Sequence, residues 1–365
     1  MKKLTMSLMA STVLAGALYA ESSSLSEAFE KGKASGEISV YTQSKNMKTS
    51  ADSGYTMNST SLNYSTDSIK GFTANLGFMN NHKISEKVIG DMGVSASEMN
   101  VANVSYAIDG VAVTVGRQAI DLEWIADYHE AITAVVTTIP NTTIVLGHTD
   151  KFTANASDGA VSKFADIGPK GDGASVADVT YKISDDMSVN AYYMDAKDVF
   201  SAVGGKFEGS FSGLGVTAKY AKSSEDNASK EDGNVMSLAL GYDVSGISLG
   251  AGYVKTDKDG GIGNLATLNS LNSNNPFEFG DNVLGTDAKT VYGSVGTNVA
   301  GFDLGATYGT TDYESTKTDK ELDIYASWEC KFVKNLNVSV LYADVNADAT
   351  GEDYSFYEAQ LVYSF

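Results

Sequence analysis

One short pattern decides the fold of this 365-residue chain, and it is clearest over residues 242–253, Tyr-Asp-Val-Ser-Gly-Ile-Ser-Leu-Gly-Ala-Gly-Tyr. Ser245 and Gly246 are turn-forming residues, and after them apolar residues alternate with small or polar ones as far as Tyr253. Alternation with a period of two is typical of a β-strand with two different faces. The stretch therefore predicts a hairpin with a tyrosine on each side of a tight turn.

The same unit returns along the chain. Alternating apolar residues that end in tyrosine follow short turns over 187–193, 214–220, 302–308 and 336–342. Tyrosine favours the level of lipid headgroups, so tyrosine rows on both sides of an aliphatic band predict a lipid-facing surface. The opposite face carries residues such as Thr217 and Ser248, which suit a water-filled lumen. A soluble sandwich with tyrosines at its strand ends is the alternative.

The repeat predicts an all-β fold, a transmembrane antiparallel β-barrel of about 18 strands. The expected strands are 36–44, 57–67, 71–80, 100–108, 111–117, 131–139, 142–150, 176–184, 187–195, 199–211, 214–221, 235–244, 247–254, 289–299, 302–309, 321–332, 336–343 and 354–365. Short connections alternate with long ones, which predicts periplasmic turns and extracellular loops. Sixteen strands is the alternative, because 131–150 and 199–211 are the least regular segments.

The N-terminal region predicts export. Lys2 and Lys3 precede an apolar run that ends in small residues at Ala20, the order of a secretory signal peptide over residues 1–20. An uncleaved membrane anchor is the alternative. We expect residues 21–35 to form a short periplasmic segment and residues 36–365 to form the barrel. The 46 acidic residues outnumber the 26 basic ones, which argues against nucleic acid as a partner.

One predicted loop, residues 118–130, differs from the other connections. Its apolar residues are spaced as on a helical turn, namely Ile120, Trp124, Ile125 and Tyr128. Between them stand four carboxylates, Asp121, Glu123, Asp127 and Glu130. An exposed loop has little reason to hold a tryptophan, so we expect this segment to fold inward and present its carboxylates to the lumen. A short helix packed outside on the rim is the alternative.

Charge within the lumen predicts a weak preference for cations. Arg117 is the sole arginine of the sequence. Strand parity predicts that its side chain extends to the lipid headgroups, whereas its position just before loop 118–130 predicts that it faces a constriction of the lumen. The acidic positions predicted to face the lumen include Asp303, Asp323 and Glu329. They outnumber the basic ones, and fixed negative charge in a narrow passage concentrates cations.

Searches for catalytic and metal-binding motifs give little. The three histidines have no metal-ligand spacing, and no cofactor is expected. Asp344, Asn346 and Asp348 have the alternating spacing that begins a calcium loop, but Ala349 stands where glycine is expected. An enzymatic barrel would need a serine or aspartate beside His129 or His148.

Three places resemble one family of proteins. The stretch from Ser24 to Glu37, the run Val115-Gly116-Arg117-Gln118 and the terminal Phe365 are similar to OprD-like and major-outer-membrane-protein porins of epsilonproteobacteria. The resemblance implies an 18-stranded, homotrimeric diffusion channel, with Phe365 as the signal read by the barrel-assembly machinery. Relatives specific for basic amino acids line their pores with arginines, and this sequence has no second arginine.

Together these observations predict a porin in the outer membrane of a Gram-negative bacterium, and no enzyme. Its expected partners are outer-membrane lipids, small hydrophilic solutes and cations, which would cross by passive diffusion. A barrel that acts mainly as an adhesin or structural surface protein is the alternative.

Overall fold

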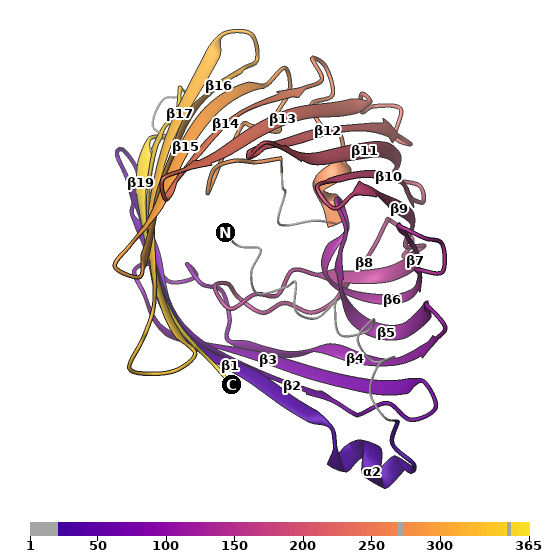
Figure 1. Cartoon of the computed structure of the whole chain (residues 1–365). Helices are drawn as coiled ribbons and strands as arrows, with labels where there is room; N and C mark the ends of the chain where they lie inside the picture. Colours follow the sequence, from indigo (N-terminus) through magenta and orange to yellow (C-terminus); the bar gives the residue numbers. More distant parts are fainter. Residues whose placement is uncertain (1–20, 269–273, 349–351) are drawn as a thin grey trace.

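The computed structural model describes residues 21–268, 274–348 and 352–365, and there the chain forms a closed ring of strands (Figure 1). The predicted signal peptide, residues 1–20, lies outside the described residues. The strands are β1 (Lys33–Met47), β2 (Ser53–Ser65), β3 (Phe72–Glu86), β4 (Ala96–Ile108), β5 (Val111–Asp121), β6 (Ala126–Val136), β7 (Thr142–Thr153), β8 (Ala165–Asp166), β9 (Ala174–Ser184), β10 (Met187–Ala196), β11 (Phe200–Phe211), β12 (Leu214–Glu225), β13 (Gly233–Val244), β14 (Ile247–Thr256), β15 (Lys289–Val299), β16 (Phe302–Tyr313), β17 (Lys317–Glu329), β18 (Leu336–Asn346) and β19 (Tyr354–Ser364). In the same described ranges the chain also forms two short helical turns, α2 (Leu25–Glu30) and η2 (Leu265–Leu268).

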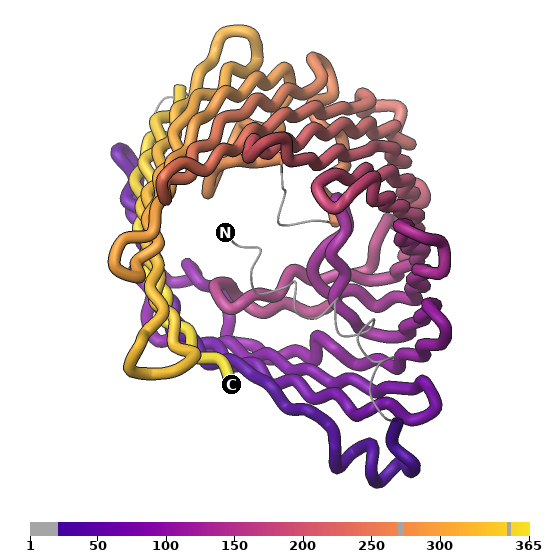
Figure 2. Tube along the Cα trace, in the orientation of Figure 1, coloured from indigo at the N-terminus to yellow at the C-terminus, as the bar shows by residue number. Residues whose placement is uncertain are grey.

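Eighteen of these strands form the wall. Each pairs antiparallel with its neighbours, and β1 closes the ring against β19 from Glu37 opposite Ser364 to Met47 opposite Tyr354. Figure 2 shows this seam where the indigo and yellow ends of the chain meet. The two-residue β8 lies on an extension of β7 and is not part of the ring, since β7 pairs directly with β9. The predicted count of eighteen is confirmed, and sixteen is wrong.

The two ends of the barrel differ in their connections. At one end, here called the short-turn rim, pairs such as Ser245-Gly246 and Ala300-Gly301 join adjacent strands with positive φ at both residues. Positive φ at both central positions is the geometry of a type I′ hairpin turn, whose twist matches that of the strands. The other end, the long-loop rim, carries the long connections, among them residues 154–173 and 257–288.

The two faces of the wall have the chemistry that the alternation predicts. Tyr181 and Tyr220 are 45% and 51% exposed on the outer face, where they flank exposed leucines, isoleucines and valines. The opposite parity faces the interior and holds buried polar residues such as Ser105 and Thr114, whose hydroxyl oxygens lie 2.9 Å apart. No helix in the described ranges is long and apolar enough to span a membrane.

The N-terminal segment packs at the short-turn rim. Ser24 caps α2 by accepting a hydrogen bond from the Glu27 backbone N–H, and the Tyr64 hydroxyl donates to the Phe29 carbonyl. The final residue, Phe365, continues the seam through two backbone hydrogen bonds with Gly36, of 2.9 and 3.0 Å. β1 begins at Lys33, inside the segment 21–35 that was expected to precede the barrel.

The prediction for residues 118–130 needs correction in its secondary structure. The expected helical turn is absent from this described segment, because β5 and β6 pair there from Arg117 opposite Glu130 to Asp121 opposite Ala126. Only residues 122–125 form the turn. The strand ladder satisfies the backbone N–H and C=O groups of the segment, which a single helical turn would leave largely unpaired. The strand expected at 131–139 is consequently shifted and covers 126–136.

Candidate functional site

The tip of the β5–β6 hairpin crosses the interior of the barrel. β5 departs from the wall at Gly116, whose φ is +117° and where a Cβ atom would come within 2.3 Å of the Ala102 carbonyl oxygen of β4. Only glycine takes that conformation without strain. Pairing between β4 and β5 ends one residue later, at Arg117. The bend at Gly116 therefore frees the end of the hairpin to turn inward.

Apolar contacts fix the hairpin tip against β10 and β11 of the wall. Trp124 is 3% exposed, and its indole N–H donates a 2.7 Å hydrogen bond to the Tyr192 hydroxyl of β10. Ile120 and Ile125 belong to the same buried cluster as Phe200 of β11 and two leucines of η2. Figure 1 shows η2 on the inside of the ring, next to the purple hairpin. The tip thus passes β7 and β9 to reach β10 and β11.

An ion-pair network accompanies these apolar contacts. Glu123 Oε1 lies 2.8 Å from Lys219 Nζ of β12, and Glu123 Oε2 lies 3.7 Å from Lys206 Nζ of β11. The side chains of Glu123 and Lys219 are 8% and 11% exposed. A second carboxylate, Glu208, lies 3.2 Å from Lys206. Among the four predicted carboxylates, Glu123 joins the tip to β11 and β12.

Arg117 sits at the root of the inward hairpin. Its Nη1 donates to Glu98 Oε1 at 2.6 Å and to the Met99 carbonyl at 2.9 Å, while Nε donates to Glu130 Oε1 at 2.8 Å. The guanidinium also lies 4.3 Å from the ring centre of Phe164. Arg117 therefore does not extend to the headgroups, as strand parity suggested, but ties β4, β6 and the segment before β8 together.

A second segment that sequence analysis missed, residues 154–164, also enters the interior. Its backbone carbonyls accept hydrogen bonds from the Tyr55 hydroxyl (2.9 Å, to Asp158) and from the Ser39 hydroxyl (3.4 Å, to Ser157). Gln360 of β19 donates to the Ser157 hydroxyl at 3.1 Å. These contacts reach β1, β2 and β19. The segment holds small and polar residues, and nothing in its local pattern signals contact with another wall.

The loop 257–288 supplies a third inward segment, in its described residues 274–282. Glu321 accepts hydrogen bonds from the backbone N–H groups of Phe279 (2.9 Å) and Gly280 (2.8 Å), and Asp323 accepts one from Glu278 (2.9 Å). Both carboxylates are 5% exposed. Asp323, predicted as a lumen charge, thus lies on the inner face but is covered by this loop.

The other predicted positions lie apart from one another. Asp121 is exposed near the hairpin tip and Asp127 is buried there with a φ of +75°. Asp303 and Glu329 stand at the short-turn ends of β16 and β17, where Asp303 accepts a 2.7 Å hydrogen bond from Asn298. The hairpin and these two carboxylates occupy opposite ends of the barrel.

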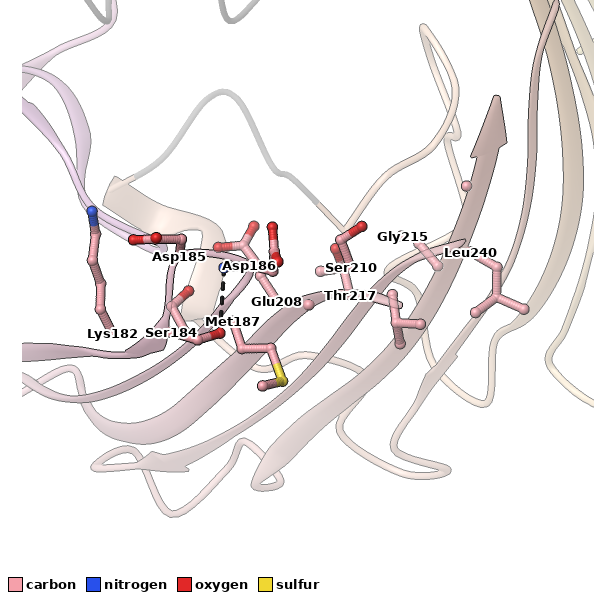
Figure 3. Close-up of a pocket in the computed structure, with 15 residues that line it drawn as sticks. Lys182, Ser184, Asp185, Asp186, Met187, Glu208, Ser210, Gly215, Thr217 and Leu240 are labelled. Carbon is pink, nitrogen blue, oxygen red and sulfur yellow. Dashed lines mark hydrogen bonds between the residues drawn. The ribbon is translucent and has the colours of Figure 1, made fainter. Parts of the chain in front are cut away.

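A cavity of about 630 Å³ opens at the short-turn rim between the ends of β9 and β13 (Figure 3). Asp185, Asp186 and Glu208 line it together with Lys182. Figure 3 also shows the 3.3 Å hydrogen bond that fixes the turn, from the Asp186 backbone N–H to the Ser184 hydroxyl. This mouth of the lumen is acidic, and Asp185 and Asp186 lie in the short connection between the predicted strands 176–184 and 187–195.

The metal and catalytic alternatives gain little from the geometry. In the described part of the chain no three His, Cys, Asp or Glu residues are grouped to hold a metal, and Asp348 instead accepts a 2.9 Å hydrogen bond from the Thr318 backbone. His148 lies 2.9 Å from Ser175 Oγ and 3.2 Å from Asp150 Oδ1. β7 and β9 are paired on both sides, so their backbone N–H groups are used in the sheet and are not directed toward a substrate beside this pair.

Comparison with known proteins agrees with this geometry. A family model of Gram-negative porins matches residues 156–365. OpdQ of Pseudomonas aeruginosa superposes with a TM-score of 0.78 at 16% identity, over 92% of this chain and 98% of that one. OccAB4 of Acinetobacter baumannii gives 0.73 at 14% identity (91% and 98%), and OccK8 (OprE) of P. aeruginosa gives 0.73 at 15% (93% and 99%). No curated protein sequence matches the chain.

Proposed function

Since the chain belongs to the family of Gram-negative porins, we propose that it conducts small hydrophilic solutes and ions by passive diffusion, with a mild preference for cations. It is an outer-membrane porin with the barrel of OprD-like channels, a channel rather than an enzyme. The observation that carries the proposal is a barrel wall with an apolar outer face and a polar inner face. Three segments, the tip of the β5–β6 hairpin, residues 154–164 and residues 274–282, pack against that inner face.

Cation preference has specific support in the charges that stay open to solvent. Three carboxylates and one lysine line the cavity at the short-turn rim. Arg117, the basic group nearest the root of the hairpin, is neutralised by Glu98 and Glu130. Fixed negative charge at a water-filled mouth raises the local concentration of cations and repels anions.

Several further features belong to the same proposal. The short-turn rim would face the periplasm and the long-loop rim the cell exterior, as in bacterial outer-membrane barrels. Residues 1–20 would be removed as a signal peptide, Phe365 would act as the assembly signal for the insertion machinery, and the barrels would form trimers. The N-terminal resemblance over Ser24–Glu37 favours an epsilonproteobacterial source.

Planar-bilayer recording of the purified protein tests the proposal. We expect ohmic current steps and, under a salt gradient, a reversal potential of the sign that indicates cation preference. Replacing Asp185 and Asp186 by asparagine should move that potential toward zero, whereas the double variant Asp303→Asn and Glu329→Gln, at two residues away from the lining of the cavity, serves as the charge-matched control. A folded barrel that carries no current would favour the adhesin or structural alternative.

A further inference from the structure

An aromatic cluster stands on the inner face beside the β1–β19 seam, near the long-loop rim. Phe279, from the inward segment 274–282, meets Tyr354 with ring centres 5.2 Å apart and planes at 87°, and meets Phe356 at 4.9 Å and 79°. Tyr354 and Phe356 share the inner face of β19 because they are two residues apart. The ring of Phe279 thus stands nearly perpendicular to those of Tyr354 and Phe356, and the three rings together are called the aromatic corner.

Hydrogen bonds hold the corner in place. The Tyr354 hydroxyl donates to Asp281 Oδ2 at 3.0 Å, and the two carboxylate oxygens of Glu321 accept hydrogen bonds from the backbone N–H groups of Phe279 and Gly280. Tyr354 is 2% exposed and Phe356 5%. These contacts hold the rings in one arrangement, which lowers the entropy lost when a ligand binds against them.

An ammonium group already occupies this corner. Lys45 Nζ of β1 lies 3.5 Å from the ring centre of Tyr354 and 5.4 Å from that of Phe279, both within the reach of a cation–π interaction. In the described ranges no carboxylate lies within ion-pair distance of Lys45 Nζ. The rings, rather than a salt bridge, position this charge.

We propose that the corner formed by Phe279, Tyr354 and Phe356 is a binding site for organic ammonium ions, and that Lys45 is a built-in competitor for it. The inference rests on the proposed porin function, since the ligand reaches the rings from the lumen. Aromatic faces select cations that are weakly hydrated, so alkylammonium ions gain more from the site than K⁺ does. Asp281, whose carboxylate accepts a hydrogen bond from the Tyr354 hydroxyl, adds a negative charge beside the corner.

The test measures block of single-channel current by tetramethylammonium added on the long-loop side, in KCl. Lys45→Met keeps an unbranched side chain and removes the competing charge, and we expect it to raise the apparent affinity for tetramethylammonium by about 3- to 10-fold, the size of an ordinary cation–π contact. Adding Phe279→Leu should abolish that gain. Lys45→Gln serves as the second variant if the methionine variant fails to insert.

Lys182→Met is the matched control. It removes a lysine at the far rim, where the cavity lining contains no aromatic ring. An equal gain in Lys182→Met, or no gain in either Lys45 variant, would overturn the proposal, because the effect would then be one of general charge or would not exist. Conductance in KCl alone is read in the same recordings, and its absence in the unmodified protein would count against the porin function itself.

Discussion

Replacing Glu123 by glutamine should weaken cation preference in a salt-dependent way. The substitution removes one negative charge and leaves Lys219 and Lys206, at 2.8 and 3.7 Å, without this partner. An ion that passes about 5 Å away in water gains or loses about 0.8 kcal/mol per unit charge. A Debye length of about 10 Å at 0.1 M salt leaves about 0.5 kcal/mol of this energy.

Cations and anions respond with opposite signs, so the two energies differ by about 1 kcal/mol and the cation/anion permeability ratio should fall about fivefold. At 1 M salt the Debye length is about 3 Å and the same substitution should change the ratio by less than about twofold. The reversal potential under a tenfold KCl gradient measures both values. Glu123→Asp keeps the charge and is the control.

Two results would refute this reasoning. An unchanged reversal potential at 0.1 M would mean that the hairpin tip stands outside the ion path. An equal change at 0.1 and 1 M would mean that the substitution reshapes the passage rather than altering its electrostatic field. Gel mobility before and after heating verifies that each variant forms a folded barrel.

Three further predictions concern the hairpin and the rim. Gly116→Ala should lower the free energy of unfolding by about 1–3 kcal/mol, since the residue is held at φ +117°, whereas Gly215→Ala, in open extended backbone, should change it little in the same urea titration. Arg117→Met should raise cation preference and increase current noise, because two carboxylates lose their shared cation; quieter recordings would contradict it. Hydrogen bonds from the backbone N–H groups of residues 259–260 lower the pKa of Asp257 below its usual 3.8, so their stabilisation of the loop is complete above that pH and is lost as the pH falls through the lower value. The rate at which pepsin cuts this loop should therefore rise as the pH falls below 3.8. In the Asp257→Asn variant the rate should depend little on pH over the same range.

The wall of the barrel follows from the sequence because its signals are local. The turn Ser245-Gly246 and the alternation after it lie within twelve residues of sequence. The same alternation predicts that Thr217 faces the lumen and that Tyr220 lies on the outer face. The number of strands, the closure of the barrel and the chemistry of its two faces all follow when this local pattern is repeated along the chain. The ends of the strands are less readable, as residues 118–130 demonstrate: an apolar spacing that fits a helical turn also fits a hairpin whose two faces are both buried.

The contents of the lumen follow much less from the sequence, because they depend on contacts between distant walls. Residues 154–164 are held by hydrogen bonds to two backbone carbonyls, which every residue has, and to the Ser157 hydroxyl, and the donors Ser39, Tyr55 and Gln360 are far away in the chain. The sequence predicts Trp124 as an inward anchor only because a large apolar side chain is unfavourable in a loop exposed to water. The sequence does not predict its partner Tyr192. Strand parity shows that Tyr192 faces the lumen, but it does not show which segment inside the lumen contacts it.

This distinction changes how the acidic excess should be interpreted. A count of carboxylates on the inner face treats each one as a free charge, but Glu321 and Asp323 spend their oxygens on backbone N–H groups of the covering loop. Charges used in this way position the segments that narrow the passage and contribute little field to its centre. The field that an ion meets must come mainly from carboxylates left open to water, such as Asp185 and Asp186 at the short-turn rim. Asp185 and Asp186 thus contribute to selectivity, whereas Glu321 and Asp323 hold the covering loop in place, and neutralising either pair should leave the property that depends on the other pair nearly intact.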